Sequence, residues 1–211
     1  MKHYENLNEY IEAHSSPEGE YLYRLYRATN VEILNPHMAS GHIQGRLLKL
    51  LVKMIRPKNI LEIGTYTGYS AICMAEGLDS DGRLYTFEID DELEDFTRKW
   101  IEGSPVGDKI NFTIGSALEI VPTLGTKFDL VFIDGNKREY IEYYEMAMKH
   151  LNDGGWILAD NTLWDGHVID PTYKDSQTNG VRAFNEYIRN DKRVEEVILP
   201  LRDGLTIIRK I

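Results

Sequence analysis

The sequence has little cysteine, no long hydrophobic run and no secretory signal. Its single cysteine, Cys73, excludes an internal disulfide, and no cluster of cysteine and histidine has the spacing of a zinc site. No run of about 18 apolar residues is present, so a membrane-spanning helix is not expected. The first residues, Met1–Asn6, lack the apolar stretch of a signal peptide. We therefore expect a cytoplasmic protein that does not bind membranes.

Positive charge is also scarce, because 24 lysines and arginines stand against 34 aspartates and glutamates, a net charge of -10. This balance opposes attraction to phosphate backbones, so nucleic acid is not the expected partner. One local exception, the basic stripe, consists of Arg46, Lys49, Lys53 and Arg56, whose spacing places them on one face of a helix. Such a stripe is most often a solvated helix face, and the alternative is a surface for an anionic substrate.

The length of 211 residues, with 42% hydrophobic and 27% charged residues, suits one sizeable core. We expect a single domain over residues 1–211. Residues 1–36 would form an N-terminal helical extension, and residues 37–211 would form the core. The extension contains a tyrosine-rich helix at Tyr21–Arg27, and such aromatic side chains are typical of a core or an interface.

From Lys58 onward, short runs rich in β-branched residues alternate with amphipathic segments of helix length. This alternation predicts βαβ units that build a parallel sheet. The expected strands are Asn59–Ile63, Arg83–Glu88, Ile110–Ile114, Phe128–Ile133 and Trp156–Ala159. The expected helices are Tyr69–Leu78, Asp91–Ile101, Ala117–Val121 and Glu139–Leu151, the last stopped by Gly154-Gly155.

The pattern changes after the fifth strand. The loop from Asn161 to Asn179 is long enough to be functional or disordered, and a helix is expected at Gly180–Arg189. Two apolar runs, Val194–Leu199 and Leu205–Arg209, flank Asp203-Gly204, which is a hairpin signal. The prediction is an α/β, Rossmann-like fold with a mostly parallel seven-stranded sheet, a terminal antiparallel hairpin and helices on both faces. This order is typical of S-adenosylmethionine methyltransferases and differs from an all-parallel dinucleotide dehydrogenase.

A glycine turn, Gly64-x-x-x-Gly68, joins the first strand to the first helix and lets the backbone approach a ligand closely. It departs from the Gly-x-Gly-x-x-Gly loop of pyrophosphate sites, which favours a cofactor without a pyrophosphate. Glu62 precedes the turn, and Glu88 ends the second strand, where a carboxylate can accept hydrogen bonds from both ribose hydroxyls. Ser116-Ala117 follows the third strand and either borders an adenine or caps the next helix.

Polar side chains end the fourth and fifth strands. Asp134 ends the fourth and Asp160-Asn161 ends the fifth, so the three side chains should meet at the carboxyl edge of the sheet. Two carboxylates and one amide suit a hard divalent cation, magnesium first, with calcium or manganese as alternatives. Taken singly, Asp134 would cap the helix that begins near Arg138, and Asp160 would turn the chain. Together with Lys137 they predict a metal site.

Four segments carry a combined motif, namely Ile133–Lys137, Ala159–Trp164, Leu61–Ser70 and Leu201–Ile207. In combination they resemble the metal-dependent catechol and caffeoyl-coenzyme A O-methyltransferases, a resemblance that spans residues 38–211. It implies metal ligation by Asp134, Asp160 and Asn161, with Lys137 beside the acceptor oxygen. The implied contacts with S-adenosylmethionine are Met38, Glu62, Gly64, Tyr66, Ser70, Glu88, Ser116, Ala117 and Asp134. Gly68, the second glycine of the turn, belongs to the same predicted cofactor site.

The chain departs from that family at two places. Gly135-Asn136 stands where the family commonly has an alanine and an acid, a change on the acceptor side. The segment Gly41–Gly45 replaces the usual Ser-Pro-Glu-x-Gly, which bears on the assignment of Met38. The resemblance and the tyrosine-rich helix together suggest a homodimer.

The predicted reaction is methyl transfer to a hydroxyl of a small molecule with two adjacent oxygens, such as a catechol. A phenol with a pKa of about 10 must be ionised before it attacks. A divalent cation would lower that pKa, while Lys137 would remove the proton or stabilise the oxyanion. Trp164 and the loop after it are the candidate lid of a partly desolvated site, with simple edge packing as the alternative.

Two other functions compete with this prediction. The acceptor could be a hydroxylated uridine in transfer RNA, as in some bacterial relatives of this family, which the basic stripe favours and the net charge opposes. The chain could also be a non-catalytic cofactor-binding or assembly protein, because a fold does not fix a function. The complete set of Asp134, Lys137, Asp160 and Asn161 opposes that last alternative.

Overall fold

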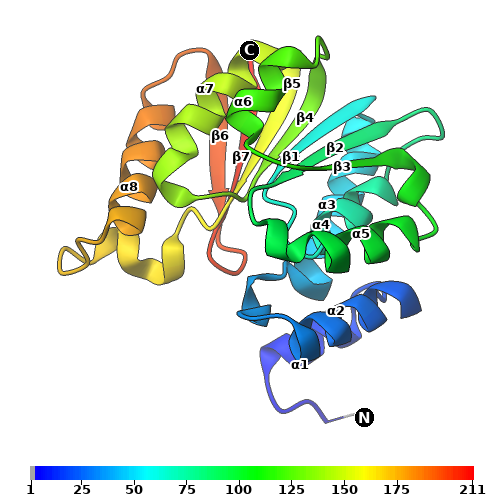
Figure 1. The fold of residues 1–211 in the computed structure, drawn as a ribbon. Coiled ribbons are helices and arrows are strands. Elements are labelled where there is room, and N and C mark those ends of the chain that lie inside the picture. Colours follow the sequence, from blue (N-terminus) through cyan, green and yellow to red (C-terminus); the bar gives the residue numbers. More distant parts are fainter. Residues whose placement is uncertain (1–2) are drawn as a thin grey trace.

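The computed structural model describes residues 3–211, so Met1 and Lys2 of the predicted extension lie outside the described residues (Figure 1). A sheet with strand order β3-β2-β1-β4-β5-β7-β6 forms the centre of the molecule. Strands β1 to β5 run parallel, and β7 pairs antiparallel with both β5 and β6. The strands are β1 (Asn59–Ile63), β2 (Arg83–Glu88), β3 (Ile110–Ile114), β4 (Phe128–Ile133), β5 (Leu151–Asp160), β6 (Val194–Leu199) and β7 (Leu205–Lys210). The predicted seven-stranded sheet with its terminal hairpin is confirmed.

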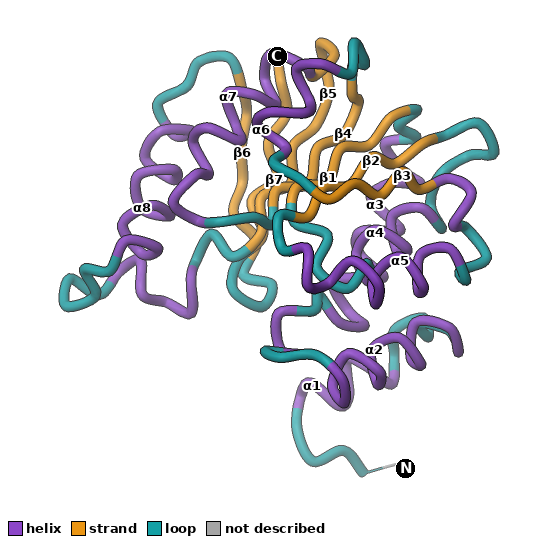
Figure 2. The backbone as a smooth tube through the Cα atoms, in the orientation of Figure 1, coloured by secondary structure: helices purple, strands orange, loops and turns teal. Residues whose placement is uncertain are grey.

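Helices lie on both faces of this sheet (Figure 2). The α-helices are α1 (Leu7–Ala13), α2 (Glu20–Glu32), α3 (Gly41–Ile55), α4 (Tyr69–Ala75), α5 (Glu94–Glu102), α6 (Ala117–Ile120), α7 (Tyr140–His150) and α8 (Ser176–Arg189). Short 3-10 helices are η1 (Pro36–Met38), η2 (Asp91–Leu93), η3 (Gly107–Lys109), η4 (Val121–Thr123), η5 (Lys137–Glu139) and η6 (Trp164–Ile169). Among residues 3–211, no helix is both long enough and apolar enough to cross a bilayer.

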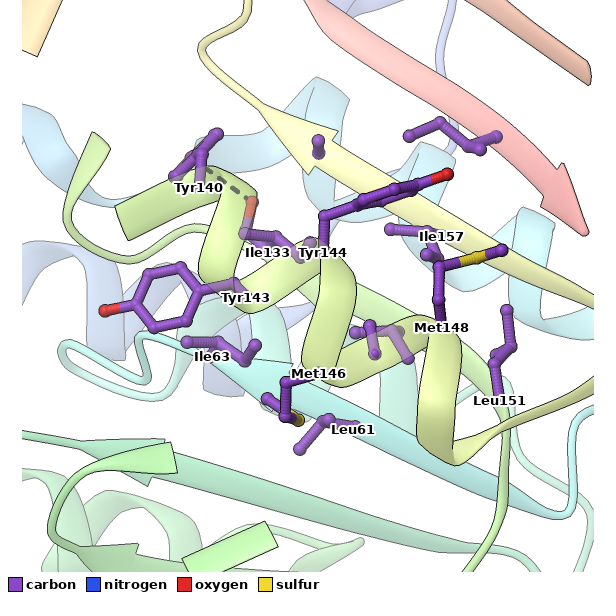
Figure 3. Close-up of a cluster of buried hydrophobic side chains, with 14 of the residues drawn as sticks. Leu61, Ile63, Ile133, Tyr140, Tyr143, Tyr144, Met146, Met148, Leu151 and Ile157 are labelled. Atoms are coloured by element: carbon purple, nitrogen blue, oxygen red, sulfur yellow. Dashed lines mark hydrogen bonds between the residues drawn. The ribbon is translucent and has the colours of Figure 1, made fainter. Parts of the chain in front are cut away.

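Two hydrophobic cores hold the layers together, because successive residues of a strand point to opposite faces. On β1, Leu61 packs under α6, α7 and α8, whereas its neighbour Ile60 packs against α2, α3 and α4. The first of these cores contains the three tyrosines of α7, which lie over Leu61, Ile63 and Ile157 (Figure 3). Both faces of the central strands are thus covered, as a parallel sheet requires.

Several element boundaries differ from the prediction. Strand β5 begins at Leu151, so Gly154-Gly155 lies inside the strand, near a register irregularity, and α7 ends earlier, at His150. Helix α8 begins at Ser176, before Gly180, because the carboxylate of Asp175 accepts a hydrogen bond from the amide of Thr178. The predicted loop is therefore shorter, and η6 occupies part of it.

The basic stripe runs along α3 to its C-cap, Arg56, and is solvated only in part, at Lys53 and Arg56. Arg46 is 8% exposed and pairs with Glu76 at 3.0 Å, and Lys49 reaches the same carboxylate at 2.8 Å. Arg56 pairs with Asp79 at 3.0 Å, while Lys53 is exposed. Three of the four cations thus bind acidic side chains of the chain itself, which weakens the case for an anionic substrate on this helix.

The N-terminal helices add to one side of the core. Helix α2 buries Leu22 and Leu25 completely, and its Tyr21 donates a hydrogen bond of 2.7 Å to the carbonyl of Trp100. Tyr26 packs edge-on against Tyr69 of α4. The tyrosine-rich helix is therefore mainly a core element.

Candidate active site

A cavity of 940 Å³ opens at the carboxyl edge of the parallel strands. The loops after β1, β2, β3, β4 and β5 line it, together with the segment before α3 and the turn between β6 and β7. Parallel strands place their carboxyl ends at one edge, which is where ligands bind in open α/β sheets. Ten of the predicted site residues lie on the cavity wall, namely Met38, Gly64, Tyr66, Glu88, Ser116, Ala117, Asp134, Lys137, Asn161 and Trp164.

Four other predicted residues lie behind that wall, namely Glu62, Gly68, Ser70 and Asp160. Glu62 is fully buried, and its carboxylate accepts hydrogen bonds of 2.5 Å from Ser70 and 2.6 Å from Thr86. Burial raises the pKa of Glu62 to about 8, although the two hydroxyl donors lower it. Glu62 and Ser70 therefore bond each other behind the cavity wall, on either side of the glycine turn in sequence.

The glycine turn has the geometry that its sequence predicts. Gly64 has φ 94°, and a Cβ at this residue would overlap the carbonyl oxygen of Asp134. Within the turn, the backbone amide of Tyr66 donates a hydrogen bond of 2.7 Å to the carboxylate of Glu88. The other carboxylate oxygen of Glu88 accepts from the amides of Ile89 and Asp90 at 2.9 and 3.0 Å. Glu88 is thereby fixed at the cavity wall with lone pairs left for further donors.

The capping alternatives for Ser116 and Asp134 are not observed. Ser116 precedes α6, but its side chain makes no capping hydrogen bond. The cap of η5 is Asn136, whose side-chain oxygen accepts from the amide of Arg138. Both Ser116 and Asp134 instead line the cavity.

Lys137 has a buried position between the fourth and fifth strands. It is 7% exposed, and its ammonium donates to Asp134 at 3.0 Å and to the hydroxyl of Tyr140 at 2.6 Å. Because an ammonium has three N–H groups, one remains for a ligand. The backbone here is closely packed, since a Cβ on Gly180 of α8 would lie 2.5 Å from the carbonyl oxygen of Lys137.

Tyr140 is a site residue that the sequence did not reveal. Its fully buried hydroxyl donates to the carbonyl of Ile133 at 3.3 Å (Figure 3). It also donates to the carbonyl of Asp160 at 2.9 Å and accepts from Lys137. It therefore connects the last residues of β4 and β5 to the ammonium. The signal in the sequence was its position three residues after Lys137, but a tyrosine at the start of an apolar helix is most simply a core residue.

Asp160 is held by polar groups from two directions. It is 2% exposed, and its carboxylate accepts from the side-chain amide of Gln44 at 2.6 Å and from the amide of Asn161 at 2.9 Å. Burial and the nearby carboxylate of Asp134 raise the pKa of Asp160 above its usual range. The buried carboxylate of Asp160 thus lies near that of Asp134, which lines the cavity.

These oxygen donors fit a hard divalent cation. Within residues 3–211, no group of three or more histidine, cysteine, aspartate or glutamate side chains is arranged to hold a metal ion. The predicted set differs from such groups because it has two carboxylates and one amide, Asn161, which lies in the left-handed region at φ 56°. One ammonium, that of Lys137, acts on both carboxylates, so the site retains negative charge for a cation to compensate.

Trp164 lies on the cavity wall, half-buried, with its ring centroid 5.9 Å from the ammonium of Lys137. The loop that follows is held in place by Arg182 of α8, which donates hydrogen bonds to the carbonyls of His167, Val168, Asp170 and Tyr173. Trp164 is therefore placed beside the predicted acceptor position.

Comparison with known proteins identifies the family. The O-methyltransferase family model matches residues 12–211. A caffeoyl-CoA O-methyltransferase of Petroselinum crispum is 36% identical over 187 residues, which cover 82% of this chain and 77% of that protein. A catechol O-methyltransferase of Niastella koreensis is 35% identical over 183 residues, which cover 84% and 83%.

Solved structures agree. The O-methyltransferase TomG from Streptomyces achromogenes, in complex with S-adenosylmethionine, matches with a TM-score of 0.86 at 31% identity and covers 95% of this chain and 94% of that one. Fold, cavity and relatives all lead to the same assignment: this chain belongs to the O-methyltransferase family and is an S-adenosylmethionine-dependent O-methyltransferase.

Proposed function

We propose that this enzyme methylates a hydroxyl of a small acceptor with two adjacent oxygens, such as a catechol, and that the reaction depends on a divalent cation, magnesium first, with calcium or manganese as alternatives. The observation that carries the proposal is the convergence of Asp134, Asp160 and Asn161 beside the ammonium of Lys137. The names of the relatives, which are caffeoyl-CoA and catechol O-methyltransferases, support the acceptor class.

Each residue of the site has a separate role in this proposal. Asp134, Asp160 and Asn161 would hold the cation, which when bound supplies Lewis-acid polarisation of the acceptor hydroxyl. The Nζ of Lys137 receives the hydroxyl proton or, as an ammonium, stabilises the oxyanion. Tyr140 keeps that Nζ in place through its 2.6 Å hydrogen bond.

The remaining wall residues orient the cofactor in this proposal. Glu88 accepts from the ribose hydroxyls, and Ser116 and Ala117 border the adenine. The turn at Gly64 brings the backbone close to the methionine part. Trp164 excludes water from the acceptor, because charge is neutralised during methyl transfer and a drier site favours that step.

The first test compares catechol with phenol as acceptors. Catechol turnover should disappear after thorough chelation and return when Mg²⁺ is added, and phenol, which lacks the second oxygen, should react poorly under all conditions. Undiminished turnover of catechol in the chelated enzyme would refute the metal role. Equal rates with both acceptors would refute the requirement for adjacent oxygens.

The second test uses the site variants Lys137→Met and Asp160→Asn, with Asp108→Asn, an exposed residue of η3 away from the cavity, as the matched control. Loss of a positioned acid–base group costs about 100-fold or more in kcat, so Lys137→Met should be nearly inactive. Asp160→Asn removes a carboxylate that would hold the cation, so it should be nearly inactive as well. Binding of S-adenosylmethionine, measured by calorimetry, should persist in Lys137→Met. The proposal fails if Lys137→Met retains more than a tenth of wild-type kcat.

The alternatives now have less support. Family membership as an O-methyltransferase decides against a non-catalytic cofactor-binding protein. The transfer RNA acceptor was favoured by the basic stripe, and three of its four cations pair with acidic side chains of this chain.

A further inference from the structure

Residues 33–40, which we call the strap, connect α2 to α3 and form one wall of the cavity. Two side chains of the core hold the strap by its main-chain carbonyls. The hydroxyl of Tyr66 donates to the carbonyls of Leu34 and Asn35 at 2.7 and 3.2 Å. The guanidinium of Arg202 donates to the carbonyls of His37 and Ala39, both at 3.0 Å, and to that of Ser40. The strap is thus bonded at both ends.

Arg202 makes these contacts from an unfavourable backbone conformation. It lies in the turn between β6 and β7 at φ 48°, in the left-handed region that disfavours any residue with a Cβ. Residues kept in such conformations often have a function that requires them. Here the side chain donates to three carbonyls and to one side chain, that of Gln44.

Gln44 extends the contact of Arg202 to Asp160. It is 1% exposed, its side-chain oxygen accepts from Arg202 at 3.2 Å, and its side-chain nitrogen donates to Asp160 at 2.6 Å. The reverse orientation of this amide would place donor against donor at Arg202 and acceptor against acceptor at the carboxylate. Arg202 therefore fixes which way Gln44 points.

The effect on Asp160 is to fix the plane of its carboxylate. Oδ2 accepts from Gln44 and Oδ1 accepts from the amide of Asn161, so rotation about the last side-chain bond would break both hydrogen bonds. Hydrogen-bond partners that orient a ligand in this way commonly change metal affinity when they are removed.

We propose that Arg202 and Gln44 are positioning residues: Arg202 orders the strap over the cavity and, through Gln44, orients the carboxylate of Asp160. The part that concerns Asp160 rests on the proposed metal role, whereas the part that concerns the strap does not. Because one guanidinium binds both the strap and Gln44, the ordered strap and the oriented carboxylate of Asp160 occur together.

The test uses Arg202→Gly and Gln44→Leu, with Arg56→Gly as the matched control. Arg56 is also an arginine in the left-handed region, at φ 55°, and its guanidinium pairs with Asp79 away from the cavity. Replacement by glycine relieves the backbone in both arginine variants, so any difference between them reports the contacts of Arg202. Mn²⁺ affinity is measured by direct titration of the folded, cofactor-free protein, and hydrogen exchange is measured across the strap in metal-free protein.

We expect the Kd for Mn²⁺ to rise at least about 10-fold in Arg202→Gly and Gln44→Leu, and to change less than about twofold in Arg56→Gly. Exchange in the strap should accelerate in Arg202→Gly alone. If Arg202 and Gln44 only stabilise the fold, their variants should have a lower unfolding midpoint and an unchanged Kd for Mn²⁺. An unchanged Kd therefore overturns the proposal that they orient Asp160, while the proposed function stands. If the wild-type protein binds no Mn²⁺, the proposed metal role and the orientation of Asp160 fail together. Hydrogen exchange tests the strap separately: equal exchange rates of the strap in Arg202→Gly and Arg56→Gly overturn the proposal that Arg202 orders it.

Discussion

Removal of a single hydroxyl, in Tyr140→Phe, should destabilise the protein and impair the site together. The variant loses the hydrogen bond from Lys137 and the bonds to the carbonyls of Asp160 and Ile133, all in a fully buried place. A bond to an ammonium contributes about 2 kcal/mol and the bifurcated neutral bond about 1, so the free energy of unfolding should fall by about 3 kcal/mol. Against a total of about 10 kcal/mol, this loss is large.

Guanidinium denaturation measures that loss. With a slope of about 5 kcal/mol per M for a chain of this size, the midpoint should fall by about 0.6 M. The control is Tyr143→Phe, which loses one hydrogen bond of 2.8 Å to Glu139 at a partly buried place and should lose about 1 kcal/mol. The kcat should fall in Tyr140→Phe because the ammonium of Lys137 loses one of its two anchors. Equal midpoints for the two variants would refute the view that Tyr140 joins β4, β5 and Lys137.

Three further perturbations give distinct results. Gly64→Ala should lower the free energy of unfolding by at least about 2 kcal/mol more than Gly154→Ala does. Both glycines have positive φ, but only a Cβ at Gly64 would overlap a main-chain carbonyl. Denaturation of the two variants measures the difference. Burial raises the pKa of Glu62 from 4.5 to about 8, so between these pH values the folded protein keeps a proton that the unfolded chain loses. The free energy of unfolding of the wild type should therefore fall over this pH range, by about 5 kcal/mol at most, relative to that of Glu62→Gln. Profiles of unfolding free energy against pH that stay parallel for the two proteins would contradict this. Gly135→Ala should raise the KM for the acceptor and spare that for the cofactor, since a Cβ there would lie 2.9 Å from the ring of Tyr143 on the cavity wall.

Local patterns in the sequence were enough to predict the sheet and the ends of its strands. Alternation of apolar runs and amphipathic segments predicts βαβ units, and parallel strands bring the residues after them to one edge. That rule predicts that Asp134 and Asn161 share one edge of the sheet, and both residues line the cavity there. It could not show that Asp160 lies behind the wall, because burial at a strand end depends on the neighbouring helix.

Two of the residues that the sequence did not reveal, Gln44 and Arg202, act across long separations. Gln44 lies 116 positions before Asp160, and Arg202 lies 158 positions after Gln44. Neither has a local pattern, because a polar residue in an amphipathic helix and an arginine in a turn are both ordinary surface features. The ion pairs of the basic stripe could not be predicted for the same reason: Glu76, which pairs with Arg46 and Lys49, comes from the C-cap of α4.

The strand order divides the chain in a way that bears on how its specificity can change. Strands β1, β2 and β3 form one half of the sheet. In the proposed function the loops after them hold the cofactor, whereas the segments after β5 and between β6 and β7 border the acceptor. Within the described sheet the two halves are joined by the β1–β4 pairing, where Asp134 lies against the turn at Gly64 and binds Lys137. Chimeras that exchange residues 161–175 and 200–204 between relatives should therefore select new acceptors while the same methyl donor is retained.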